Sequence, residues 1–135
     1  MKYLGIDYGE KRIGLAVSDL TNTIATSYKY IINNKSKLAN LNNIVKELNI
    51  SHIVIGLPLL LNGQKGEKAV IVEEFAKNLA NELGANIEII FEDERLTTVS
   101  AERILLEGDV SRKKRKGKID ALAATLILQK YLDRF

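Results

Sequence analysis

The chain has 135 residues, of which 46% are hydrophobic and 27% charged, with one proline and no cysteine. This length and apolar content predict one folded domain over residues 1–135. The lack of cysteine excludes disulfides, thiolate zinc sites and thiol catalysis, and a single histidine excludes histidine clusters. No apolar run approaches the roughly 18 residues of a membrane span, so we expect a soluble, cytoplasmic protein with no membrane partner.

The positive charge is concentrated in one segment. The chain carries 20 Lys and Arg against 17 Asp and Glu, for a net charge of +3. Six cations occupy seven consecutive positions: Arg112, Lys113, Lys114, Arg115, Lys116 and Lys118. Without them the net charge would be −3, so the basic character is local. Such a segment predicts a surface that binds nucleic-acid phosphates, and a solvated loop is the alternative.

The first three predicted elements form an antiparallel meander. We expect a strand over residues 2–7, a glycine-containing turn, and a second strand over residues 13–18. Residues 24–32, rich in Ile, Thr and Tyr, predict a third strand. Asp7 ends the first strand, where a buried carboxylate is costly unless a metal ion, a basic partner or backbone N–H groups compensate it. The alternative is an Asp that caps its own turn.

Strands and helices alternate in the rest of the chain. We expect a helix over residues 37–48, a strand over 53–56, an amphipathic helix ending at Leu83 and a strand over 87–91. A short helix from Thr97 or Thr98 to Glu107 then leads into a basic loop. The last helix is expected over residues 118–132. This order predicts an α/β fold with a mixed five-stranded sheet. A three-strand antiparallel meander would join two parallel strands, with helices on both faces.

Acidic residues recur where ligands bind in such sheets, beyond the carboxyl ends of strands. Asp7 ends the first strand, and Asp93 and Glu94 follow the fifth. Asp120 lies in the first turn expected for the last helix, where the helix dipole favours an acid. Carboxylates gathered in one place repel one another unless a cation neutralises them. Mg²⁺ or Mn²⁺ suits oxygen ligands of this kind. A solvated acidic turn at residues 92–94 is the alternative.

Four motifs carry a resemblance that runs from about residue 3 to residue 131. They are residues 5–9 (GIDYG) with 12–14 (RIG), residues 54–58 (VIGLP), residues 93–98 (DERLTT) and residues 116–121 (KGKIDA). In this order they resemble the YqgF family, whose members are described as Holliday-junction-resolvase-like and as pre-16S rRNA nucleases. The resemblance implies an RNase H-like fold and a cytoplasmic, divalent-metal nuclease.

The same resemblance implies roles for the acids. Asp7 matches the family's first-strand acid and Asp120 its last-helix acid. The middle acid is Glu94 or its neighbour Asp93, with Glu94 favoured. Related resolvases carry a carboxylate on the strand that here ends with Gly56, where this chain has none, so Asp93 or Glu94 must supply it. We therefore expect Asp7, Glu94 and Asp120 to hold the metal.

Basic residues near the acids are candidates for nucleic-acid binding. Lys11 and Arg12 follow Asp7 and either bind a phosphate or pair with Glu10. Arg95 either binds substrate or forms a surface ion pair, which would contribute at most about 1 kcal/mol. Together with the basic segment, these residues would bring a phosphodiester backbone to the carboxylates.

Three functions remain open at this stage. The first is a nuclease in 5′-end processing of pre-16S rRNA, and the second is a resolvase of Holliday junctions or other structured DNA. The third is a non-catalytic RNA-binding factor of ribosome assembly. Residues 5–9 also resemble the first phosphate loop of the actin, Hsp70 and sugar-kinase group, whose members need two such domains. Both a monomer and a weak homodimer are compatible with the sequence.

Overall fold

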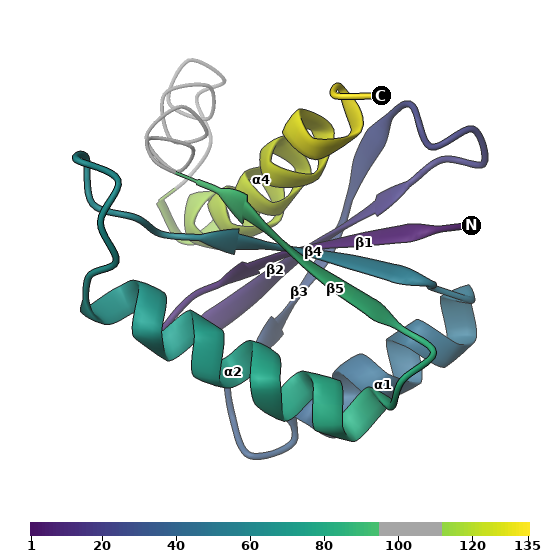
Figure 1. The fold of residues 1–135 in the computed structure, drawn as a ribbon, viewed down its shortest axis with the longest axis horizontal. Helices are drawn as coiled ribbons and strands as arrows, with labels where there is room; N and C mark the ends of the chain where they lie inside the picture. The colour runs from purple at the N-terminus through teal and green to yellow at the C-terminus, as the bar shows by residue number, and fades with distance from the viewer. Residues whose placement is uncertain (95–111) are drawn as a thin grey trace.

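The computed structural model describes residues 1–94 and 112–135, with only the backbone described over 112–118 (Figure 1). Its elements in chain order are β1 (Tyr3–Tyr8), β2 (Arg12–Ser18), β3 (Ala25–Ile32), α1 (Lys37–Leu48), β4 (His52–Leu57), α2 (Glu67–Leu83), β5 (Glu88–Asp93) and α4 (Arg112–Leu132). This order confirms the predicted meander followed by strand–helix units. The helix predicted to end at Glu107 lies outside the described residues.

The five strands form one mixed sheet in the order β3-β2-β1-β4-β5. β2 pairs antiparallel with both β1 and β3, whereas the β1–β4 and β4–β5 pairs are parallel. The predicted sheet is therefore confirmed. Because β1, β4 and β5 run in the same direction, their carboxyl ends lie at one edge of the sheet, beside the starts of α2 and α4 (Figure 1).

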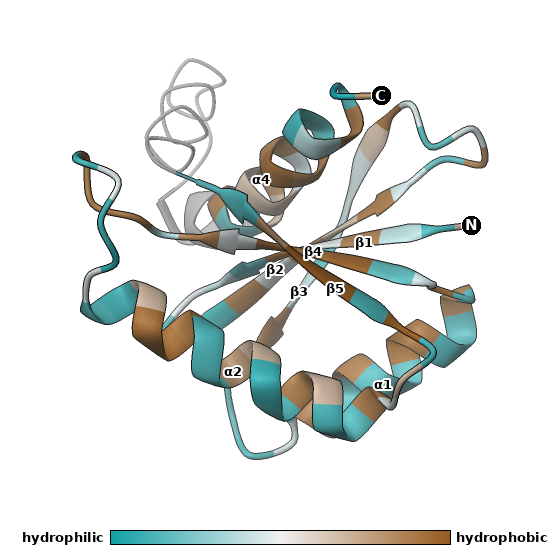
Figure 2. Cartoon of the chain, in the orientation of Figure 1, coloured by the Kyte–Doolittle hydropathy of each residue, from teal (hydrophilic) through white to brown (hydrophobic). Residues whose placement is uncertain are grey.

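The sheet separates two helical layers. α1 and α2 pack on one face, and α4 crosses the other (Figure 1). Leu4 and Ile6 of β1 pack toward α1 and α2, so the alternation of a strand directs Tyr3, Gly5 and Asp7 toward α4. Figure 2 shows the resulting concentration of hydrophobic residues in the strands between the layers. Within residues 1–94 and 112–135, no helix has the length and apolar character needed to cross a membrane.

The last helix begins earlier than expected. α4 starts at Arg112, so the basic segment forms its first turns and the prediction of a loop is wrong. Lys and Arg are good helix formers, and Gly117 costs only about 1 kcal/mol relative to Ala. Asp120 consequently lies more than two turns from the start of α4. The expected stabilisation of Asp120 by the helix dipole, which acts within the first turn, is therefore also wrong.

Candidate active site

Asp7 lies in the middle strand of the sheet, near its carboxyl end. It pairs with Gly14 of β2, and only 8% of its surface is exposed. Burial raises the pKa of Asp7 to about 6; a hydrogen bond with Glu94 opposes this rise, and the charge of Asp120 adds to it. A buried carboxyl group between two other acids is energetically costly, and such groups are concentrated at functional sites.

Glu94 reaches Asp7 from the end of β5. This strand continues to Asp93, two residues past the end expected at Phe91, because its ladder with β4 extends to the pair of Leu57 with Asp93. The Glu94 N–H then donates to the Leu57 carbonyl oxygen at 3.3 Å. Burial, the charge of Asp7 and the hydrogen bond to Asp7 together raise the pKa of Glu94 to about 9. The raised pKa favours the protonated form of Glu94, in which its O–H donates a hydrogen bond to the Asp7 carboxylate.

Asp120 approaches Asp7 from α4. A Cβ at Gly14 would overlap the Asp120 carbonyl, so the glycine allows α4 to lie this close to β2. Arg12 Nε donates to Asp120 Oδ2 at 2.7 Å. Burial raises the pKa of Asp120, and the Arg12 guanidinium opposes the rise. The structure thus pairs Arg12 with Asp120, a partner that the sequence did not indicate.

The oxygen donors suit a hard divalent cation. Glu94 Oε2 is buried and has no hydrogen-bond partner among the described residues. A carboxyl oxygen with no partner among the described residues, beside a second buried carboxyl group, is a place where a cation would be stabilised once the groups are ionised. Asp7 and Glu94 are in contact, whereas Asp120 is bonded to Arg12. Accordingly, the part of the chain that the structure describes contains no cluster of three acidic or histidine side chains close enough to hold a metal ion.

Two cations near the C-terminus contact the other acidic residues of this segment, one through a side chain and one through the backbone. Arg134 Nη2 donates to Glu92 Oε2 at 2.6 Å, and Lys130 Nζ donates to the Asp93 backbone oxygen at 3.1 Å. Glu92 is only 1% exposed, so the solvated turn considered for residues 92–94 is wrong. Because Glu92 and Glu94 are two residues apart, they share the α4 face, and Asp93 lies on the alternate face. Glu94 is the acid of this segment that is hydrogen-bonded to Asp7.

Lys68 is a basic residue near the acids that the sequence pattern did not single out. It lies in the first turn of α2, and its charge lowers the pKa of Glu94. No motif marks an exposed lysine on a helix, so only the tertiary structure reveals this proximity. Lys11 is exposed in the β1–β2 turn. The described part excludes Arg95 and the side chains of Arg112, Lys113, Lys114, Arg115, Lys116 and Lys118.

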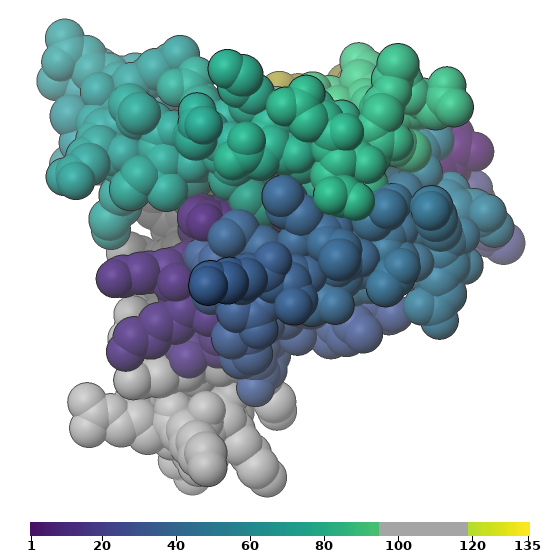
Figure 3. Space-filling model, turned by 90° about the horizontal axis from the view of Figure 1, so that it is seen from below, coloured from purple at the N-terminus to yellow at the C-terminus, as the bar shows by residue number. Residues whose placement is uncertain are grey.

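The β1–β2 turn lies close to the start of α2, at one end of the face that α1 and α2 cover (Figure 3). Tyr8, the last residue of β1, packs against Phe75 in the middle of α2, with ring centroids 4.3 Å apart. The contact anchors the end of β1 to α2, directly after Asp7. It therefore gives Tyr8 a packing role.

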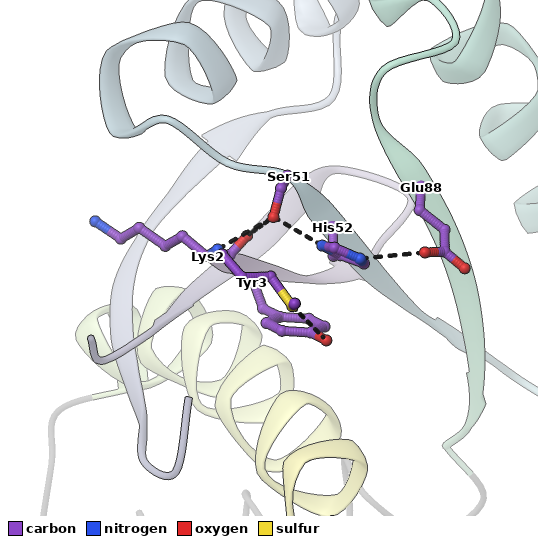
Figure 4. Close-up of polar contacts among 6 residues, drawn as sticks. Lys2, Tyr3, Ser51, His52 and Glu88 are labelled. Carbon is purple, nitrogen blue, oxygen red and sulfur yellow. Dashed lines mark hydrogen bonds and ion pairs between the residues drawn. The ribbon is translucent and has the colours of Figure 1, made fainter. Parts of the chain in front are cut away.

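The single histidine, His52, lies at the amino end of β4, away from Asp7 (Figure 4). Its Nδ1 shares a hydrogen bond with Ser51 Oγ at 2.7 Å, and its Nε2 lies 3.1 Å from Glu88 Oε2. The Tyr3 ring stacks on the imidazole with a centroid separation of 4.7 Å. Tyr3 also borders a cavity of about 340 Å³ between the β2–β3 turn and the end of α4. These features belong to the end of the sheet opposite Asp7.

Sequence comparisons cover almost the whole chain. A profile of the family described as "RuvX: Holliday junction resolvase" matches residues 1–134. A protein named "Putative pre-16S rRNA nuclease" from Sulfurihydrogenibium sp. (strain YO3AOP1) is 48% identical over 133 residues, covering 98% of this chain and 90% of that protein. A protein of the same name from Clostridioides difficile (strain 630) is 47% identical over 134 residues, covering 98% and 94%. These matches confirm the resemblance found in the motifs.

Two solved structures share the fold. T. thermophilus RuvC in complex with a Holliday junction substrate aligns with a TM-score of 0.58 at 15% identity, covering 99% of this chain and 95% of that one. The complex of Fowlpox virus resolvase with substrate Holliday junction DNA aligns with a TM-score of 0.60 at 12% identity, covering 99% and 98%. At these identities the likeness concerns the fold alone, and it confirms the expected RNase H-like architecture.

Proposed function

Because the chain belongs to the RuvX family, we propose that it is a nuclease that hydrolyses phosphodiester bonds in the 5′-end processing of pre-16S rRNA. The two relatives above, which are nearly half identical to it along their length, carry the corresponding name. The observation that best supports the activity is the buried contact between Asp7 and Glu94. Such a contact destabilises the fold, which is typical of groups retained for chemistry.

The proposed cofactor is Mg²⁺ or Mn²⁺, held by Asp7 and Glu94 with Asp120 as the third acid. A bound ion of this kind stabilises charge on a phosphoryl oxygen and lowers the pKa of the attacking water. The protein's own contribution is to hold two carboxyl groups in place at the ends of β1 and β5. Glu94 must give up its proton before it can bind the ion, and Asp120 must exchange its contact with Arg12. The alternative catalytic acid of this segment is Asp93, which would have to act from the opposite face of β5.

The cations around the acids are proposed to bind the nucleic-acid backbone. The residues assigned this role are Lys11, Arg12, Arg95, Arg112, Lys113, Lys114, Arg115, Lys116 and Lys118. Because the basic segment and Asp120 share α4, phosphates bound at the start of the helix would lie on the element that carries one of the acids. Such contacts supply salt-dependent, sequence-independent affinity.

A four-way DNA junction is the second candidate substrate. The family profile is described as a Holliday junction resolvase, and two structures of the same fold contain junction DNA. The acid pair serves either substrate, since both contain phosphodiester bonds.

Cleavage assays with both substrates test the proposal. The wild type and Asp7→Asn are incubated with a pre-16S rRNA fragment that retains its 5′ leader, or with a four-way junction, in Mg²⁺ or Mn²⁺. We expect the wild type to shorten the RNA and Asp7→Asn to bind it with unchanged affinity without cutting it. Cleavage of the junction alone would select the second substrate. Equal metal-dependent cleavage by both proteins would contradict a catalytic Asp7, and binding without cleavage by either would indicate an assembly factor.

A further inference from the structure

Gly56 of β4 lies directly beneath the Glu94 carboxyl group. A Cβ built on Gly56 would lie 2.6 Å from Glu94 Oε2 and 3.0 Å from Glu94 Cδ. The first distance is too short for any van der Waals contact between carbon and oxygen, so a methyl group and the carboxyl cannot share this space. The Glu94 carboxyl thus occupies the volume that a side chain at position 56 would need.

The register of the sheet explains why these two residues meet. Gly56 pairs with Glu92 of β5, and the parallel ladder ends one residue later at Leu57 and Asp93. Glu94 is the next residue of its strand on the α4 face. Its N–H is bonded to the Leu57 carbonyl, which holds its backbone beside the end of β4. From there the Glu94 side chain passes across Gly56 toward β1, where it is hydrogen-bonded to Asp7.

Two other buried glycines on this face have a different neighbour. A Cβ at Gly5 would lie 2.8 Å from Leu128 Cβ and 2.9 Å from the Ala124 carbonyl oxygen, and a Cβ at Gly14 would overlap the Asp120 carbonyl. Both positions therefore accommodate the close approach of α4. At Gly56 the α4 contact is only the end of a flexible side chain, Ile127 Cδ1 at 2.5 Å. The next two nearest atoms both belong to the Glu94 carboxyl group.

We infer that Gly56 is a positioning residue of the acidic site, whose missing side chain leaves the space through which Glu94 reaches Asp7. A carboxyl group at this place in the site can then be supplied by a side chain at position 56 or at position 94, and in this chain position 94 supplies it. The inference rests on the proposed nuclease function for its activity test, but its structural part stands independently. Glu94 Oε2, the oxygen nearest to Gly56, is also the one that lacks a hydrogen-bond partner among the described residues, so displacement of the carboxyl group would act against its hydrogen bond to Asp7.

The first test is a crystal structure of Gly56→Ala. We expect the Glu94 carboxyl to move away from Asp7, with the sheet and α4 unchanged. Gly56→Ala/Ile127→Val removes the nearest α4 atom, Ile127 Cδ1. Glu94 should be displaced in this double variant as well, and Ile127→Val alone should leave it in place. A Glu94 carboxyl that stays on Asp7 in both alanine variants would overturn the inference, whatever the protein's activity.

The second test moves the carboxyl group from one strand to the other. Glu94→Ala should lower the rate of metal-dependent cleavage at least a hundredfold. Gly56→Glu/Glu94→Ala should cleave at least ten times faster than Glu94→Ala. The carboxyl carbon of a glutamate at position 56 can reach about 2.5 Å from its Cβ, close to the present site of Glu94 Cδ. Gly56→Gln/Glu94→Ala is the matched control, because it has the same shape without the charge.

The two tests separate failure of the inference from failure of the proposed function. If the wild type cuts neither RNA nor DNA, the proposed nuclease function is wrong. The crystal structures of the alanine variants would then test the role of Gly56 on their own. If the wild type cuts, recovery with Glu but not with Gln at position 56 supports the inference. Equal recovery with Gln would show that position 56 acts through packing and would overturn it.

Discussion

At the amino ends of β1 and β4, polar groups are linked in series by hydrogen bonds, whereas at the carboxyl ends of β1 and β5 the buried Asp7 contacts the carboxyl group of the partly buried Glu94. Ser51 Oγ accepts the Lys2 N–H at 3.1 Å and shares a hydrogen bond with His52, which in turn contacts Glu88 (Figure 4). At the other end Glu94 Oε2 has no partner among the described residues. The first arrangement stabilises the sheet, and the second destabilises it.

This contrast indicates that the candidate active site lies at the carboxyl ends of β1 and β5. Polar groups with satisfied hydrogen bonds contribute modestly to stability, and their loss is felt mainly in folding. Buried like-charged groups reduce stability and are relieved only by a cation or a proton. Variants at the amino ends of the strands should therefore change mainly stability, whereas variants at the carboxyl ends should change mainly cleavage.

The largest effect is expected for Asp7→Asn. Loss of this acid should lower metal-dependent cleavage by about a thousandfold, which corresponds to about 4 kcal/mol of transition-state stabilisation. The same change removes a buried charge and should raise the melting temperature in metal-free buffer by a few degrees. Cleavage assays and calorimetric melting measure the two effects on the same preparation.

His52→Gln is the matched variant at the opposite end. It breaks the contacts with Ser51 and Glu88 and should lower the melting temperature without changing the cleavage rate. If His52→Gln lowered cleavage as strongly as Asp7→Asn does, the functional distinction between the two ends would be wrong.

The next largest effect concerns the basic start of α4. Replacing Lys113, Lys114, Arg115 and Lys116 by Ala should weaken RNA binding at least tenfold. The slope of log K against log salt concentration should become shallower by about three, as expected for the loss of about four phosphate contacts. Filter binding over a range of salt concentrations measures both quantities.

The control for this variant removes cations from the other helical layer. Lys46→Ala/Lys77→Ala changes exposed residues of α1 and α2. Its salt dependence should equal that of the wild type, and a similar loss in both variants would show that the effect comes from net charge rather than from α4.

Metal-free stability should depend on pH through the acid pair. In the folded protein the pKa of Glu94 is raised from 4.5 to about 9 and that of Asp7 from 3.8 to about 6. The folded state therefore binds more protons than the unfolded state above pH 4, so the free energy of unfolding should fall as the pH rises toward 9. Urea titrations at several pH values measure this slope.

Glu94→Gln supplies the control for the pH dependence. It retains the hydrogen-bonding shape without a titrating group at position 94, so the slope between pH 6 and 9 should be largely lost. Mg²⁺ or Mn²⁺ should likewise restore stability most at high pH, where both acids are ionised. A wild-type slope of zero in metal-free buffer would contradict the proximity of the two carboxyl groups.

The smallest effect is expected at Ser51. Ser51→Ala removes hydrogen bonds to Lys2 and His52 and should cost about 1 kcal/mol of unfolding free energy. Cleavage should be unchanged. A stability loss together with a loss of cleavage would mean that the two ends of the sheet are coupled.

Much of this architecture could be predicted from local patterns. Apolar runs and turn residues specify the strands, and a carboxylate that ends an apolar strand marks Asp7 as unusual. The basic segment was expected as a loop because its charge gives no apolar periodicity, although its residues favour a helix. Its helical state also moves Asp120 away from the helix terminus where the sequence had placed it.

The details of the candidate site depend on contacts between distant residues. The choice between Asp93 and Glu94 requires knowing that β5 extends to Asp93, which sets the face of each side chain. The bond of Arg12 to Asp120 joins residues far apart in the chain. Lys68 and Gly56 carry no chemical signature of their own, and their relation to Glu94 arises only from the packing of α2 and β4 around it.

A crystal of the protein soaked in Mn²⁺ tests the central claim most directly. Anomalous diffraction should show manganese bonded to carboxylate oxygens of Asp7 and Glu94, with the hydrogen bond between the two groups broken. Bound manganese found only elsewhere in the molecule, with that hydrogen bond intact, would contradict the account.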